Sequence, residues 1–189
     1  MPSTLRHTAA AAATLLALTL AASVLAQGVR VLGTIDGTLG GEPRTWYALD
    51  YGLDADEAQP TATFSDFGFG FLSLSIVANP EQRFMVEGAI SVDITAMAGL
   101  DCPCVFDDAE VVYWSGPSMF SDLYVSDEPG RARVTITRWE QVSDGVFALE
   151  GEVEAELVYR EGIFAEPDGA RTLRLEASIA IGEVPEEVF

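Results

Sequence analysis

The sequence predicts an all-β protein: a single-domain antiparallel β-sandwich of about eight or nine strands, with a closed antiparallel β-barrel as the alternative. Apolar and polar residues alternate with period two along most of the chain, which is typical of strands with one buried and one solvated face. Clusters of Gly, Pro, Asn and Asp separate these segments. No long segment has the 3.6-residue period of an amphipathic helix, so nothing supplies the crossovers that a parallel sheet requires.

The first 26 residues have the features of a secretory signal peptide. Arg6 and His7 form a short basic start, and an alanine-rich apolar run follows. Val24 and Ala26 occupy the −3 and −1 positions of a cleavage site, which predicts Gln27 as the mature N-terminus. The apolar run is rich in Ala and Thr and is short for a membrane span. We therefore expect a bacterial protein that is exported to the periplasm or secreted.

Residues 27–189 are enough for one domain that buries its own core. We expect residues 27–182 to form the β-sandwich domain and residues 183–189 to form a loose acidic tail. Neither an internal repeat nor a linker divides this part of the sequence. The sequence therefore predicts a single domain that exists as a monomer or a small homo-oligomer.

The mature chain is strongly acidic. Loss of the leader removes Arg6 and leaves nine arginines, no lysine and 30 acidic residues, a formal net charge of −21. This charge repels phosphate groups, so we expect neither nucleic acid nor an anionic membrane surface as a partner. The acidity fits a highly soluble protein or, alternatively, one that binds divalent cations. The expected partner is an extracytoplasmic protein or a glycan.

Residues 29–51 are predicted to form a β-hairpin. One face of its first strand carries Val29, Val31, Gly33 and Ile35. The GGEP sequence at 40–43 is a turn signal, and the RTWYALDY sequence then returns as the second strand. The acidic loop at 52–60 follows and contains the DADE sequence.

Residues 61–78 form an aromatic, glycine-rich segment. Phe67, Phe69 and Phe71 share one face, whereas Leu72, Leu74 and Ile76 have the opposite parity. This change of face predicts a bulge or a tight bend near Gly70. We expect the phenylalanines to pack in the core, with an aromatic ligand platform as the alternative.

The second half of the chain continues the alternating pattern. A turn at 79–82 precedes the clearest predicted strand, residues 83–95. Residues 110–114 form a short strand, and residues 115–130 are irregular. Three further strands are predicted at 131–139, 145–159 and 171–182. In the second of these, Glu150, Glu152, Glu154 and Glu156 form one face.

Both cysteines of the chain lie in the loop sequence AGLDCPCVFDDAE. Because the predicted compartment is oxidising, a disulfide between Cys102 and Cys104 is the first interpretation. It would close a very small ring and bend the chain. One alternative is a redox-active or metal-binding pair assisted by Asp101, Asp107 or Asp108, although acidic neighbours raise thiol pKa values and disfavour a reactive thiolate. Another is a bond to a second chain.

Two acidic loop stretches are weak calcium candidates. Asp54, Asp56 and Glu57 belong to the first, and Asp107 and Asp108 belong to the second. Calcium requires six to eight oxygen ligands, and neither stretch has the spacing of an EF-hand loop. We therefore expect solvated acidic loops, with no metal site and no cofactor.

The absence of histidine and lysine from the mature sequence restricts its chemistry. Without histidine, the Ser-His-Asp and Cys-His arrangements and the usual catalytic zinc sites cannot form. Without lysine, Ser-Lys hydrolysis and Schiff-base chemistry are excluded. A hydrolase based on a pair of carboxylates is the remaining enzyme class, and any acidic chain offers many such pairs.

The first functional hypothesis is therefore a secreted or periplasmic, non-enzymatic β-sandwich that binds or scaffolds an extracytoplasmic ligand. Trp114, Phe120 and Tyr124 are candidate ligand contacts, with capping of the core as the alternative use of these rings. A second hypothesis is a small outer-membrane β-barrel, because the strand count and the terminal Phe189 suit one. Pro185 and several short strands argue against it. The carboxylate-dependent hydrolase is the third hypothesis.

Overall fold

The computed structural model describes residues 28–52, 59–68, 70–97, 102–126 and 131–187. These residues form eleven β-strands and no helix, and neighbouring strands of the sheet pair antiparallel. The predicted all-β antiparallel fold is confirmed. Within the described ranges, no helix has the length and apolar character needed to cross a membrane.

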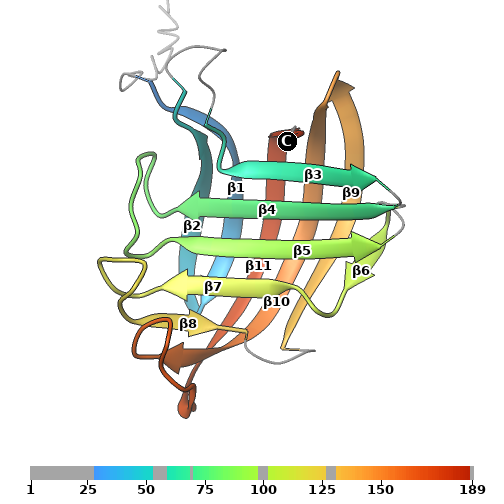
Figure 1. Ribbon diagram of the computed structural model, residues 1–189. Helices are drawn as coiled ribbons and strands as arrows, with labels where there is room; N and C mark the ends of the chain where they lie inside the picture. Colours follow the sequence, from blue (N-terminus) through green and yellow to red (C-terminus); the bar gives the residue numbers. More distant parts are fainter. Residues whose placement is uncertain (1–27, 53–58, 69, 98–101, 127–130, 188–189) are drawn as a thin grey trace, which may run out of the picture.

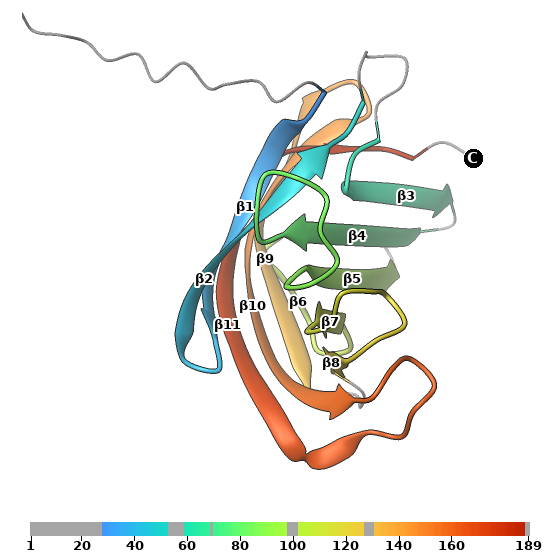
Figure 2. The same cartoon turned by 90° about the vertical axis from the view of Figure 1, so that its left-hand side faces the viewer.

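The strands are arranged in two packed layers (Figure 1). The long-strand layer consists of β1 (Arg30–Leu39), β2 (Glu42–Asp50), β6 (Cys104–Phe106), β9 (Ala132–Ser143), β10 (Val146–Arg160) and β11 (Asp168–Pro185). The short-strand layer consists of β3 (Ala62–Gly68), β4 (Phe71–Asn79), β5 (Ile90–Met97), β7 (Glu110–Trp114) and β8 (Leu123–Val125). Figure 2 shows the long strands curving around one side of the short ones.

Hydrogen-bonded pairing continues around the two corners between the layers. The strand order is β11-β1-β2-β4-β5-β7-β8-β10-β9-β6, and β10 also pairs with β11, which closes a ring of eight strands. The corners are narrow: β2 pairs with β4 at two positions and β8 with β10 at three. The molecule is therefore two packed layers that are joined at both sides by short pairings.

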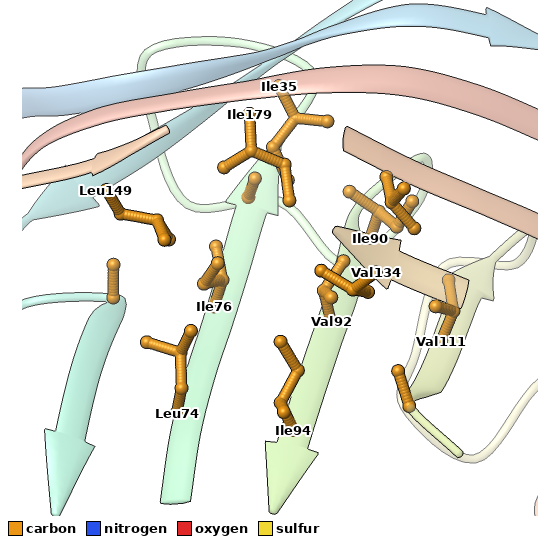
Figure 3. Close-up of a cluster of buried hydrophobic side chains, with 14 of the residues drawn as sticks. Ile35, Leu74, Ile76, Ile90, Val92, Ile94, Val111, Val134, Leu149 and Ile179 are labelled. Atoms are coloured by element: carbon orange, nitrogen blue, oxygen red, sulfur yellow. The ribbon is translucent and has the colours of Figure 1, made fainter. Parts of the chain in front are cut away.

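The core lies between the layers. Figure 3 shows Ile35, Leu149 and Ile179 of the long-strand layer facing the short-strand layer, which contributes Leu74 and Val92. All five side chains are buried, and each fully buried Leu, Ile or Val contributes about 1.5–3 kcal/mol relative to exposure. The period-two pattern places apolar side chains inward because successive residues of a strand point to opposite faces.

The glutamate row predicted on residues 145–159 faces solvent. Glu150, Glu152, Glu154 and Glu156 of β10 are exposed. The intervening Leu149, Gly151, Val153, Ala155 and Leu157 are buried. The predicted alternation of this strand is confirmed.

The first strand departs from simple alternation. A register shift between Val31 and Gly33 in its pairing with β2 leaves Val31 exposed and buries Leu32. Further along, β1 approaches β11 very closely, because a Cβ atom added at Gly33 or Gly37 would lie 2.3 or 2.1 Å from a carbonyl oxygen of β11. Glycine at these positions allows the two strands to pair.

Two predicted strands have different boundaries in the structure. Residues 61–78 form a hairpin and not one bent strand, because β3 ends at Gly68 and β4 begins at Phe71. Gly68 and Gly70 have φ values of 74° and 80°, the left-handed conformation that favours glycine in a tight reversal. The strand predicted at 83–95 begins only at Ile90, and Phe84 is 65% exposed.

The acidic end of the chain joins the sheet. β11 continues to Pro185, so the predicted boundary between domain and tail at residue 182 lies inside a strand. The Val184 side chain is buried. The backbone nitrogens of Glu186 and Glu187 donate hydrogen bonds of 2.7 Å to the carbonyl oxygens of Gly145 and Phe64. The tail therefore covers the end of the core near β3.

Candidate binding surface

Two loops at one end of the molecule carry large apolar side chains into solvent. Residues 115–122 connect β7 to β8, and residues 161–167 connect β10 to β11; Figures 1 and 2 show the two loops at the same end. The loops touch, since a Cβ atom added at Gly162 would lie 2.8 Å from the carbonyl oxygen of Phe120. We define the apolar tip as four exposed residues: Met119 (55% exposed), Phe120 (72%), Ile163 (36%) and Phe164 (92%).

Hydrogen bonds shape the first of these loops. The Ser121 hydroxyl donates to the carbonyl oxygen of Ser118 at 2.6 Å and accepts from the Ser118 backbone nitrogen at 3.0 Å. The backbone nitrogens of Ser115 and Gly116 both donate to the carbonyl oxygen of Asp122 at 3.0 Å. These bonds close the loop at its base and around its turn, so Met119 and Phe120 are held by a preformed backbone.

The second loop is also a tight structure. Gly162 has a φ of 87°, and its carbonyl oxygen accepts a 3.2 Å hydrogen bond from the Ala165 nitrogen. A carboxylate oxygen of Asp168 accepts a 3.1 Å bond from the Ala170 nitrogen where β11 begins. Ile163 and Phe164 therefore occupy the turn enclosed by the first of these bonds. A residue other than glycine at 162 would be strained and would collide with Phe120.

A row of three tyrosines supports the sheet below the loops. Tyr113 of β7, Tyr124 of β8 and Tyr159 of β10 are direct neighbours across the strands. The ring centroids of Tyr113 and Tyr124 are 6.3 Å apart with the rings tilted, and those of Tyr124 and Tyr159 are 5.4 Å apart with the rings edge-on. The guanidinium carbon of Arg171 lies 3.3 Å from the centroid of the Tyr159 ring, and hydrogen bonding to Tyr159 raises the pKa of Arg171. This row closes one end of the core.

The three aromatic residues predicted as ligand contacts occupy different environments. Phe120 is exposed at the apolar tip. Tyr124 is half-buried in the tyrosine row and packs against the core. Trp114 is half-buried at the end of β7, where its backbone nitrogen donates to the carbonyl oxygen of Ala89 at 3.0 Å. Of the three, Phe120 alone lies on the apolar tip.

Sequence reasoning missed three of the four tip residues: Met119, Ile163 and Phe164. The available signal was the pair of apolar residues in EGIFAEPDG, a segment that is otherwise polar and lies between two strongly alternating strands. An apolar pair in such a turn has no strand partner to bury it. The neighbours of the pair are acidic, since Glu161, Glu166 and Asp168 are all exposed.

The cysteine pair lies where β6 begins, at the edge of the long-strand layer (Figure 1). The Cys102 and Cys104 sulfurs are 3.0 Å apart and not covalently bonded, whereas a disulfide bond measures about 2.05 Å. Both side chains are half-buried and pack against the core. The structure holds them as neighbouring thiols, and the predicted disulfide stays a prediction.

Of the five calcium candidates, Asp107 and Asp108 are within the described residues. Asp54, Asp56 and Glu57 lie outside the described residues. Asp107 accepts a 2.6 Å hydrogen bond from the Arg133 Nε atom, and Asp108 is exposed in the following turn. In the described part of the chain, no three His, Cys, Asp or Glu side chains are placed to hold a metal ion.

Two shallow hollows lie on the outer face of the long-strand layer. The larger, about 450 Å³, is lined by Arg131, Arg133 and Arg174 together with Asp107, Glu154 and Glu156. The other, about 370 Å³, is lined by Asp36, Glu152, Glu154 and Glu176. Arg133 pairs with Asp107 and Arg174 with Glu176, each at 2.6 Å. Such exposed ion pairs contribute little to stability.

Comparison of the chain with protein-family models, with curated proteins and with solved structures found no significant match.

Proposed function

We propose that this protein is an exported, non-enzymatic binding protein that attaches to another extracytoplasmic protein through its apolar tip. The observation that carries the proposal is the exposure of Met119, Phe120, Ile163 and Phe164 on two loops that touch each other. Large apolar side chains that share an exposed surface are typical of interaction sites, because their transfer from water into an interface is favourable.

The energetics favour the tip as an interaction anchor. Full burial of a phenylalanine side chain contributes about 1.5–3 kcal/mol, and a few aromatic anchors commonly dominate an interface. The hydrogen bonds of Ser118 and Ser121 hold the first loop before any partner arrives. A preformed loop loses less conformational entropy on binding, so more of the burial energy appears as affinity.

The charge around the tip defines the chemistry of the partner. Glu161, Glu166 and Asp168 flank Ile163 and Phe164 in the sequence and are exposed, and the whole chain carries 30 acidic residues against 10 basic ones. We therefore propose an apolar pocket with a basic rim on the partner protein. An anionic lipid surface would be repelled by the same charges. A glycan remains the competing ligand class, because exposed aromatic rings also stack on sugars.

Export is part of the proposal. The signal features of residues 1–26, with cleavage predicted before Gln27, support export of the mature chain to the periplasm or out of the cell. Fractionation of the producing cells tests this: the mature chain should appear in the periplasmic or secreted fraction with Gln27 at its N-terminus. Recovery in the outer membrane would instead support the hypothesis of a small outer-membrane β-barrel.

Site-specific photo-crosslinking in the producing cells tests the binding surface. A photoreactive phenylalanine analogue at position 164 should yield a discrete adduct with a protein, and the adduct should be sensitive to protease. The same analogue at position 67, an exposed phenylalanine on the β3 strand at the opposite side of the short-strand layer, is the matched control and should not yield that adduct.

Two further measurements make the outcome decisive. The adduct at 164 should disappear when Phe120 is also changed to Ser, and its yield should fall as salt is added, because salt screens the proposed contact between acidic and basic rims. An adduct resistant to protease and sensitive to glycosidases would replace the protein partner with a glycan. Equal adducts at positions 67 and 164, or none at either, would contradict the proposal.

A further inference from the structure

The cysteine pair lies at the end of the long-strand layer. β6 is the last strand in the sheet order and, among the described strands, pairs with β9 alone. The pairing has three positions: Cys104 opposite Ile136, Val105 opposite Thr135 and Phe106 opposite Val134. Because so few pairs hold it, an edge strand of this length opens more easily than the long central strands.

The two sulfurs are placed for bond formation within the chain. They are separated by 3.0 Å, and a shift of about 1 Å would bring them to the length of a disulfide bond. Both side chains are half-buried, and both pack against the core, so the pair is held from behind while remaining reachable from solvent. This arrangement favours a bond between Cys102 and Cys104 over a bond to another molecule.

We propose that Cys102 and Cys104 form a reversible dithiol–disulfide site whose oxidation restricts the chain at the start of β6 and thereby stabilises the pairing of β6 with β9. The oxidant is a small-molecule disulfide such as oxidised glutathione. One cysteine thiolate attacks a sulfur of this oxidant, forms a mixed disulfide and releases one glutathione thiolate. The second cysteine thiolate then attacks the cysteine sulfur of the mixed disulfide and releases the other glutathione thiolate. The protein loses two electrons and two protons, and two reduced glutathione molecules are formed.

The bond acts on β6 because Cys104 is its first residue. A disulfide to Cys102 reduces the conformations available to this segment when it separates from β9, so it penalises the open state more than the closed one. The closed edge also exposes fewer unpaired backbone groups to other chains. Oxidation should therefore lower the rate of local opening of β6 and leave the opposite end of the molecule unchanged.

The test uses the purified mature chain, first reduced and then equilibrated with excess oxidised glutathione. The expected product is a monomer that is lighter by two hydrogens, has no titratable thiol and regains both thiols with dithiothreitol. Cys102→Ser and Cys104→Ser should instead each carry one glutathione, because the second attack is no longer available. A product with two glutathiones per chain, a dimer sensitive to reductant, or thiols that remain unreacted would overturn the proposal.

Amide hydrogen exchange tests the effect on the strand. Residues 104–106 should exchange several-fold more slowly in the oxidised chain than in the reduced chain, whereas residues 123–125 of β8, the other three-residue strand, should exchange at the same rate in both. In the Cys102→Ser chain, which cannot form the internal disulfide, oxidant should not slow the exchange of residues 104–106. Equal exchange rates of residues 104–106 in the oxidised and the reduced chain would refute the proposed effect of the disulfide on β6.

Discussion

The two ends of the sandwich use aromatic residues in opposite ways. At the end covered by the tail, Phe64, Trp139 and Phe147 form an aromatic box: the Trp139 and Phe147 rings stack with centroids 4.8 Å apart, and Phe64 meets both edge-on at 5.2 and 5.0 Å. At the other end, the rings of Phe120 and Phe164 extend into solvent beyond the tyrosine row.

The difference follows from where the residues lie in the fold. The members of the box come from β3, β9 and β10, so strand pairing and layer packing bring their side chains together. The tip residues are on loops beyond the last paired positions of β7, β8 and β10, where no opposing strand is present. Aromatic residues therefore stabilise the fold at one end, whereas at the other their burial energy remains available for a partner.

Phe64→Ala should have the largest effect on stability. The side chain is buried, and its removal leaves a cavity beside Trp139 and Phe147, which should cost about 3–5 kcal/mol of unfolding free energy. Urea denaturation followed by tryptophan fluorescence measures this change. A loss below about 1 kcal/mol would mean that the box does not hold this end together, since that is the cost of an average substitution.

The second largest effect on stability should come from acid, which should destabilise the end of the molecule that carries the aromatic box. Burial raises the pKa of the Asp50 carboxyl, but hydrogen bonds from the Gly52 nitrogen, Arg30 and the Gln59 nitrogen outweigh it, and the folded-state pKa lies below the ordinary 3.8. Arg30 also pairs with Glu183 of β11, so this cluster ties β1, β2 and β11. A lowered folded pKa means that the stabilisation is present above pH 3.8 and is lost as the pH falls through the folded value.

Asp50→Asn tests this cluster directly. The variant should lose about 1–3 kcal/mol at neutral pH, because the bonds to a charged group are replaced by weaker ones. Its unfolding free energy should also fall less steeply below pH 4 than that of the unchanged protein, as about one titrating group is removed. Parallel acid profiles for the two proteins would show that Asp50 does not contribute.

Tyr159→Leu should have a smaller effect on the opposite end. Leucine keeps an apolar side chain in the buried position but removes the ring contacts with Tyr124 and Arg171. We expect a loss of about 0.5–1.5 kcal/mol in urea unfolding, the usual contribution of an aromatic pair beyond area burial. A cost equal to that of Phe64→Ala would remove the contrast between the two ends.

The double substitution Phe120→Ser and Phe164→Ser should change stability least. Both side chains are already exposed in the folded chain, so the unfolding free energy should stay within about 0.5 kcal/mol of its original value. Crosslinking to the proposed partner from a photoreactive analogue placed at position 119 should nevertheless be lost. A substantial destabilisation would show instead that the tip belongs to the core and does not serve as a free surface.

The strands that were predicted well are those in which alternation is uninterrupted. β10, with its glutamate row, could be located because the period of two is a local property of the chain. The hairpin of β1 and β2 was located by its turn signal at residues 40–43, although the register shift at Val31 changes which residues of β1 are buried. The hairpin at Gly68 and Gly70 was read as one bent strand, since two strands joined by a very short turn look continuous in sequence. Phe84 was placed in a strand because an apolar residue fits the alternation whether or not a neighbouring strand pairs with it.

The apolar tip shows what local patterns could not supply. Phe120 was recognised as a loop aromatic, but its neighbours Ile163 and Phe164 lie on a distant segment and reach it only through the contact of Gly162 with the Phe120 backbone. The two cysteines, in contrast, are two residues apart, and a bond between them was the first interpretation because the predicted compartment is oxidising. Alternation depends only on adjacent residues, and composition is a simple count, so both can be taken from the sequence alone. They were enough to predict the fold class and the acidic outer face. Which exposed side chains share one surface depends on how the two layers close, and that is a property of packing between distant segments.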